Sequence, residues 1–129
     1  MEEILMTIDE ESWEQIKSGK KTIEIRKSKP KNIFYPFRVI ACVKGGVGVV
    51  GKFDVDSIVK TITPETLVKE SCMTLKEILF HSDGKSVCGW HIKAGSVVEY
   101  ETAFPLEMAT GIKNQPVSWC YLNKDVENE

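Results

Sequence analysis

Apolar and polar residues alternate with a period of two along several short segments, which is the pattern of strands with one buried face. In the segment 22–26, Ile23 and Ile25 share one face. Glu24 and Arg26 then lie side by side on the other face. The same pattern predicts strands over residues 4–8, 22–26, 37–43, 47–59, 88–92, 97–104 and 118–122. Glycines 48 and 51 in the longest segment predict bulging or strong curvature, as a closing barrel requires.

Three stretches have the signals of short helices instead. Asp9 can cap a helix over residues 10–18, which Gly19 would end. A Thr-Pro pair at residue 63 opens a second helix to about residue 70, and a capping box that begins at Thr74 opens a third to about residue 80. Strands and helices do not alternate regularly. The expected class is therefore α+β, a curved antiparallel sheet or small barrel with about three short flanking helices.

A chain of 129 residues is long enough for one domain and too short for two. Its 42% hydrophobic and 28% charged residues are typical of globular proteins and argue against disorder. We predict a single domain over residues 1–124 and a frayed acidic tail over residues 125–129.

The acidic start of the chain has neither the basic residues nor the apolar run of a signal peptide, and no apolar stretch approaches membrane-spanning length. This predicts a cytoplasmic protein with no membrane partner. The four cysteines form no Cys-x-x-Cys pair, so we expect reduced thiols. His81, Cys88 and His91 fall within eleven residues, but their spacing matches no metal motif, and we expect neither a metal nor a cofactor.

The formal net charge of −2 conceals a local reversal of charge. Residues 1–16 carry six acids and no base, whereas residues 17–31 carry seven bases and the single acid Glu24. Such a segment could attract an anion. Within it, Gly19, Lys21, Glu24 and Arg26 form a Gly-x-Lys-x-x-Glu-x-Arg pattern where the helix turns into a strand. Lys21 can join the Glu24 and Arg26 pair only if the chain bends at this junction, which Gly19 permits.

Two common site motifs fail on their context. Residues 46–51 spell Gly-x-Gly-x-x-Gly, but the residues that follow alternate like a strand, and a phosphate loop must lead into a helix. A hydrolase triad cannot be assembled either, because the chain has only two histidines and no nucleophile-elbow sequence.

The helix that ends in Ser-Gly-Lys-Lys at residues 18–21, the strand 22–26, the segment Gly-Lys-Phe-Asp-Val at 51–55 and Trp-His-Ile at 90–92 together resemble the ASCH domain, a family of small PUA-like β-barrels. The Gly-x-Lys-x-x-Glu-x-Arg pattern is the specific part of the match. The resemblance implies a cleft in which the charged residues of the pattern face a ligand, and related domains bind RNA or modified nucleosides.

The resemblance leaves catalysis open. Some ASCH-like proteins are amidohydrolases that deacetylate N4-acetylcytidine with a lysine, a threonine three residues later and a distant glutamate. This sequence has Lys21, but Glu24 stands where that threonine would be. Other ASCH-like proteins are described as ribonucleases. In an enzyme of either kind Lys21 and Glu24 would be the catalytic candidates, supplying charge stabilisation and a general base.

We expect a basic cleft that binds RNA or a modified nucleoside through Lys21, Glu24 and Arg26. Arg26 offers a planar fork for phosphate or a carbonyl edge, and Glu24 an acceptor for an exocyclic amine such as that of cytosine. Two alternatives remain: Glu24 and Arg26 form a salt bridge that only braces the strand, or the chain is a regulatory protein-interaction domain without a nucleotide ligand.

Aromatic residues are the candidates for stacking on a base. Trp119 and Tyr121 share one strand face, so that they either line the cleft together or pack against the core together. Trp90 is a further candidate for either position.

Overall fold

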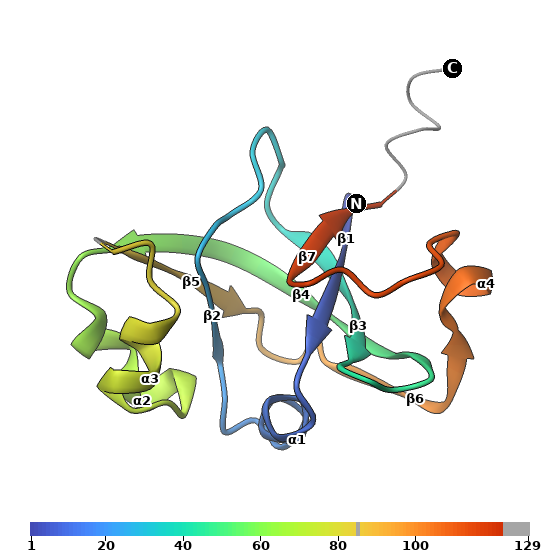
Figure 1. Cartoon of the computed structure of the whole chain (residues 1–129), viewed down its shortest axis with the longest axis horizontal. Helices are drawn as coiled ribbons and strands as arrows, with labels where there is room; N and C mark the ends of the chain where they lie inside the picture. The colour runs from blue at the N-terminus through green and yellow to red at the C-terminus, as the bar shows by residue number, and fades with distance from the viewer. Residues whose placement is uncertain (85, 123–129) are drawn as a thin grey trace.

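The computed structural model describes residues 1–84 and 86–122, which form one curled sheet with short helices around it (Figure 1). The strands of this described part are β1 (Glu3–Ile8), β2 (Ile23–Arg26), β3 (Phe37–Val43), β4 (Gly48–Thr61), β5 (Val87–Ile92), β6 (Val98–Pro105) and β7 (Trp119–Tyr121). Its helices are α1 (Glu10–Ser18), the 3-10 turn η1 (Pro64–Leu67), α2 (Val68–Ser71), α3 (Leu75–Phe80) and α4 (Leu106–Thr110).

The strand order is β2-β5-β4-β3-β1-β7, with β6 paired to β4 outside this path. The sheet curls so that β2 at one end turns toward β1 and β7 at the other (Figure 1). The predicted α+β class with a curved sheet is confirmed. The sheet is mixed, however, because β1 runs parallel to β3 while the five other pairings are antiparallel. Alternation within a strand predicts its faces but not its partner, so the sequence could not reveal this parallel pair.

The three predicted helices are present at the places where their signals lie. Asp9 accepts a hydrogen bond from the backbone N–H of Ser12, and Gly19 ends α1 with φ of 83°. Both bonds of the capping box at Thr74 and Glu77 are formed at the start of α3. The second helix is divided into η1 and α2. The fourth helix, α4, had no sequence signal, because Pro105 at its start offers no side-chain cap and none of its residues is buried.

Two groups of buried side chains hold the elements that carry the polar pattern. The larger group packs β1, β3, β4 and β5 against α1, and its members include Trp13, Phe37, Phe53 and Trp90. The smaller group fixes β2 and β5 against the helices that follow β4, and its buried members are Ile23, Ile25, Leu67, Ile78 and Val87. Strand β2 therefore contributes its apolar face to the smaller core and directs its polar face toward the inside of the curl.

The predicted acidic tail at residues 125–129 lies outside the described residues. None of the helices in the described residues is long and apolar enough to span a membrane.

The two glycines of β4 lie where other backbone passes very close. The pairing of β4 with β6 shifts register between Val49 and Gly51. A Cβ on Gly51 would overlap the carbonyl oxygen of Val98 and come within 2.7 Å of the Trp13 ring. A side chain at this position would therefore push β6 or α1 away from β4.

We expect Gly51→Ala to lower the free energy of unfolding by about 2 kcal/mol, since inserted atoms in a packed core usually cost about 1–3 kcal/mol. Urea denaturation measures this change. Val47→Ala, at a position that is 88% exposed just before β4, is the matched control and should change stability by less than about 0.5 kcal/mol. Equal stability of the two variants would show that β6 can move aside without cost.

Candidate functional site

The bend between α1 and β2 brings Lys21 to the polar face of β2. Gly19 donates its backbone N–H to Ile16 O, and Lys21 donates its own to Gln15 O at 3.1 Å. This tight exit from the helix turns the Lys21 side chain toward Glu24. The bend that the sequence required is therefore present.

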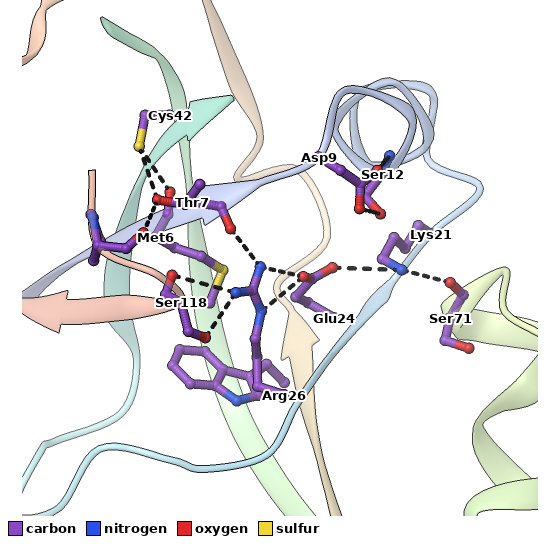
Figure 2. A network of polar contacts seen from close by, with 12 residues as sticks. Met6, Thr7, Asp9, Ser12, Lys21, Glu24, Arg26, Cys42, Ser71 and Ser118 are labelled. Atoms are coloured by element: carbon purple, nitrogen blue, oxygen red, sulfur yellow. Dashed lines mark hydrogen bonds and ion pairs between the residues drawn. The ribbon is translucent and has the colours of Figure 1, made fainter. Parts of the chain in front are cut away.

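Lys21, Glu24 and Arg26 form a continuous ionic chain (Figure 2). Lys21 Nζ donates to the backbone oxygen of Ser71 at 2.7 Å and lies 3.5 Å from Glu24 Oε1. Glu24 Oε2 accepts from Arg26 Nη2 at 2.7 Å and from Arg26 Nε at 3.0 Å. Lys21 and Glu24 are only 2% and 5% exposed. The polar face of β2 is thus buried, and not a solvent-facing surface.

The guanidinium of Arg26 is fully used within the protein. Besides its two bonds to Glu24, Nη1 donates to the hydroxyl and the backbone oxygen of Ser118, at 2.9 and 3.3 Å, and Nη2 donates to Thr7 O at 2.9 Å. A guanidinium has five N–H groups, and five hydrogen bonds are formed. Arg26 therefore retains no free N–H for a phosphate, and its two bonds to Glu24 position that carboxylate. Because Arg26 also lines the cleft, its contact with a ligand stays a prediction.

Glu24 Oε1 is the exception in this network. It is buried, and no hydrogen bond reaches it from any described residue. The Lys21 ammonium at 3.5 Å compensates its charge but does not donate to it within hydrogen-bond geometry. A buried acceptor without a donor costs roughly 1–3 kcal/mol, and more when it is charged. Within this network Oε1 is therefore the acceptor that the described residues leave without a donor.

A cleft of about 630 Å³ lies over this chain of charges. Its walls come from the ends of β1 and β2, from the first turns of α1, from the residues around α3, and from the segment before β7. It is lined by Thr7, Asp9, Glu11, Ser12, Gln15, Lys21, Glu24, Ile25, Arg26, Lys27, Ser28, Lys44, Cys72, Met73, Glu77, His81, Val117 and Ser118. This volume falls within the range of about 300–1,000 Å³ that is usual for small-molecule sites.

The cleft is balanced in charge and not basic, contrary to expectation. Its lining holds four bases, Lys21, Arg26, Lys27 and Lys44, and four acids, Asp9, Glu11, Glu24 and Glu77. Several lysines of the basic segment do not line it. Lys17, for example, bonds to Glu99 at 2.7 Å on the outside of α1. A count of charges along the chain could not foresee which lysines the fold directs away.

Trp90 lies in the hydrophobic core, and Trp119 and Tyr121 pack against that core. Trp90 is fully buried, Trp119 packs edge-on against it with ring centroids 5.7 Å apart, and Tyr121 packs against Trp119 at 5.4 Å. Neither Trp119 nor Tyr121 belongs to the lining of the cleft. These contacts do not favour stacking of Trp119 and Tyr121 on a ligand in this cleft, and that role stays a prediction. Trp119 lies behind the cleft wall, where its indole N–H donates to Ser28 Oγ at 3.2 Å.

Glu77 reaches the cleft from α3, far from the motif in sequence. Hydrogen bonds from the backbone N–H and hydroxyl of Thr74 hold the pKa of the Glu77 carboxyl below its usual value, and the charges of Lys21 and His81 act in the same direction. The sequence identified Glu77 as part of a capping box. It gave no signal that α3 faces the Lys21 motif.

His81, Cys88 and His91 do not converge. On β5, His91 pairs with Ile23 and Cys88 pairs with Arg26. Because His91 and Cys88 are three residues apart on the same strand, their side chains lie on opposite faces. Burial raises the pKa of the Cys88 thiol, so it stays protonated near neutral pH. Among residues 1–84 and 86–122, no three His, Cys, Asp or Glu side chains are grouped to hold a metal ion.

The structure thus defines a small α+β half-barrel with a polar cleft over a buried ionic chain. No family model matches the sequence, and no curated protein matches it. Among solved structures, the ASCH protein of Zymomonas mobilis is similar, with a TM-score of 0.75 and 19% identity over 98% of this chain and 91% of that one. A tyrosine-to-phenylalanine variant of the Zymomonas mobilis protein gives a TM-score of 0.78 at 17% identity, over 99% and 95% of the two chains. A serine-to-alanine variant gives 0.77 at 17%, over 98% and 92%.

The chain therefore has the ASCH fold, as the resemblance implied, and the likeness covers nearly its whole length. At this level of identity the likeness is one of fold.

We expect Arg26→Lys to destabilise the protein by about 2 kcal/mol or more, because the ammonium cannot replace the bonds to Thr7 and Ser118 while holding Glu24. Thermal and urea unfolding measure the loss. The matched control is Arg38→Lys, where a more exposed arginine makes one bond of 3.2 Å to Asp54. A cost at Arg26 no larger than that at Arg38 would contradict the bridging role.

Proposed function

We propose that the cleft binds the base of a nucleoside, either as a free modified nucleoside or as an unpaired residue of RNA. The carrying observation is Glu24, a residue of the cleft lining whose Oε1 is a buried acceptor with no donor among the described residues. A ligand that places an N–H on this oxygen removes the cost of leaving it unpaired.

The charge pattern favours a base over a phosphate as the group on the floor. A phosphate would bring its negative charge onto the carboxylate of Glu24, and Arg26 has no N–H left to bind it. The edge of cytosine offers an exocyclic amine as donor beside a ring nitrogen that accepts. Glu24 Oε1 and Lys21 Nζ, 3.5 Å apart, supply an acceptor beside a donor.

Charged residues at the edge of the cleft can also contact the phosphates of a nucleotide chain. Lys27 and Lys44 line the cleft and are exposed, so their ammonium groups are available to backbone phosphates. The acids Asp9 and Glu11 on the same rim weaken that attraction. The site is therefore suited to base recognition, with a modest contribution from phosphates.

A second candidate function, hydrolysis of an amide on the same nucleoside, is favoured by Glu77. It places a second carboxylate in the cleft, close enough to Lys21 and His81 for their charges to act on it. The ASCH-like amidohydrolases use a lysine, a threonine three residues later and a distant glutamate, and this chain has Glu24 in place of that threonine. In that reaction water cleaves the amide bond of N4-acetylcytidine, and the products are cytidine and acetate.

The binding proposal predicts a specific change of preference in Glu24→Gln. Because Arg26 donates twice to Oε2, the glutamine would turn its oxygen to Arg26 and present its NH2 to the cleft. Cytidine should then lose affinity by roughly tenfold or more, the worth of a hydrogen bond to a charged group, and its advantage over uridine should disappear. Isothermal titration calorimetry with both nucleosides measures this.

Glu11→Gln is the matched control, since Glu11 lines the same cleft but is exposed. It should leave both affinities unchanged. Circular dichroism and thermal unfolding verify that the Glu24 variant is folded. If wild type binds no nucleoside, or if a folded Glu24→Gln binds cytidine as wild type does, the proposal is wrong.

The enzymatic candidate is tested by mass spectrometry after incubation with N4-acetylcytidine. If it is correct, wild type releases cytidine, while Lys21→Met, which keeps the length of the side chain but removes the charge, does not. Binding of N4-acetylcytidine without release of cytidine by wild type would leave recognition as the function of the cleft.

A further inference from the structure

We propose that Phe80 and His81 form a stacking subsite for the base next to the one held over Lys21 and Glu24, which makes a single strand of RNA the preferred ligand. This inference rests on the proposed function. It names the form in which the nucleoside arrives, and it assigns a role to an aromatic pair outside the charged motif.

Phe80 is strongly exposed to solvent. Its side chain is 81% exposed, although it lies at the end of a helix whose Ile78 is completely buried in the smaller core. Ile78 fixes α3 against the sheet, so Phe80 is held out in solvent by a packed helix. A single exposed apolar residue is normal on a protein surface, so the exposure of Phe80 is of interest here because its ring contacts His81, which lines the cleft.

Phe80 adjoins the cleft through its contact with His81. His81 lines the cleft, and its ring lies edge-on to Phe80, with centroids 5.5 Å apart and planes at 86°. Glu77, one helical turn earlier, also lines the cleft and is influenced by the charges of both Lys21 and His81. Lys21, Glu77 and His81 therefore line the same cleft, and Phe80 adjoins it through its contact with His81.

In a single strand, the base next to the bound one also needs a surface to contact. A base seated on the floor of the cleft within a strand leaves its neighbour at the mouth, where it must find either water or a flat apolar surface. Stacking on aromatic side chains is the usual means by which proteins hold unpaired bases, and it is tolerant of sequence. The aromatic residues expected to do this, Trp119 and Tyr121, are packed behind the wall. Among the described lining residues, His81 is the one with an aromatic ring, and Phe80 extends it as a second ring.

The test compares two trinucleotides with the same number of phosphates: ApCpA, and the same molecule with both adenines removed. Wild-type protein should bind ApCpA between about fivefold and a hundredfold more tightly, the usual contribution of one stacked base. Phe80→Ala should abolish that difference and leave the affinity for cytidine unchanged. Fluorescence anisotropy with labelled trinucleotides measures the first, and calorimetry the second.

The matched control is Phe34→Ala. Phe34 is 84% exposed in the loop between β2 and β3 and does not line the cleft, so its removal should change neither affinity. Because Phe80 is exposed, Phe80→Ala is expected to fold normally, and thermal unfolding verifies this.

The outcomes separate the two proposals. If wild type binds cytidine but gains nothing from the adenines, or if Phe80→Ala keeps the gain, the stacking subsite is wrong and the nucleoside site stands. If wild type binds neither cytidine nor ApCpA, both proposals are overturned. A gain that Phe34→Ala removes and Phe80→Ala does not would place the second base elsewhere and overturn the subsite.

Discussion

The rest of the site depends on the hydrogen bonds that the Arg26 guanidinium donates to Glu24, Thr7 and Ser118. The curled sheet ends at β2 on one side and at β7 on the other, and among the described strands β2 is not paired with β1 or β7. Arg26 bridges this gap with its side chain, donating to Thr7 on β1 and to Ser118 just before β7. A side chain thus completes a half-barrel that the backbone leaves open, which also creates the space for a cleft beside it.

Closing the sheet with a cation places a charge in a partly buried position, and this requires a compensating anion. Glu24, two residues earlier on the same strand face, supplies it through one oxygen. The second oxygen is buried without a donor, and Lys21 compensates its charge without donating to it within hydrogen-bond geometry. The three charges sum to +1, so the floor can take a neutral or partly negative edge of a ligand. In the proposed site, one oxygen of this carboxylate serves the structure and the other would serve recognition.

The sequence predicted those parts of the site that depend on neighbours along the chain. Alternation placed Glu24 beside Arg26, and Gly19 allowed the bend that brings Lys21 to them. It could not show that the strand's polar face would turn inward, because this depends on the curl of the whole sheet. For the same reason Ser118 was not foreseen as part of the cleft, and the sequence left open whether Glu77 or Glu101 would supply a second carboxylate to it. Ser118 and Glu77 lie there because β7 and α3 pack where they do. The choice between cleft and core for Trp119 and Tyr121 was open in the sequence, since parity fixes a shared face but not what that face meets.

The unpaired oxygen of Glu24 also explains how such a small site could be selective. A ligand with an N–H at the right place restores a hydrogen bond, whereas a ligand with an acceptor there leaves Oε1 without a donor and adds repulsion. The difference between these two cases exceeds the worth of a single hydrogen bond, because the buried group is penalised in one and satisfied in the other. The oxygen is held by a strand and an arginine that also closes the sheet, so it cannot turn away to escape the penalty. Rigidity that the fold needs for its own closure is what makes the floor discriminating.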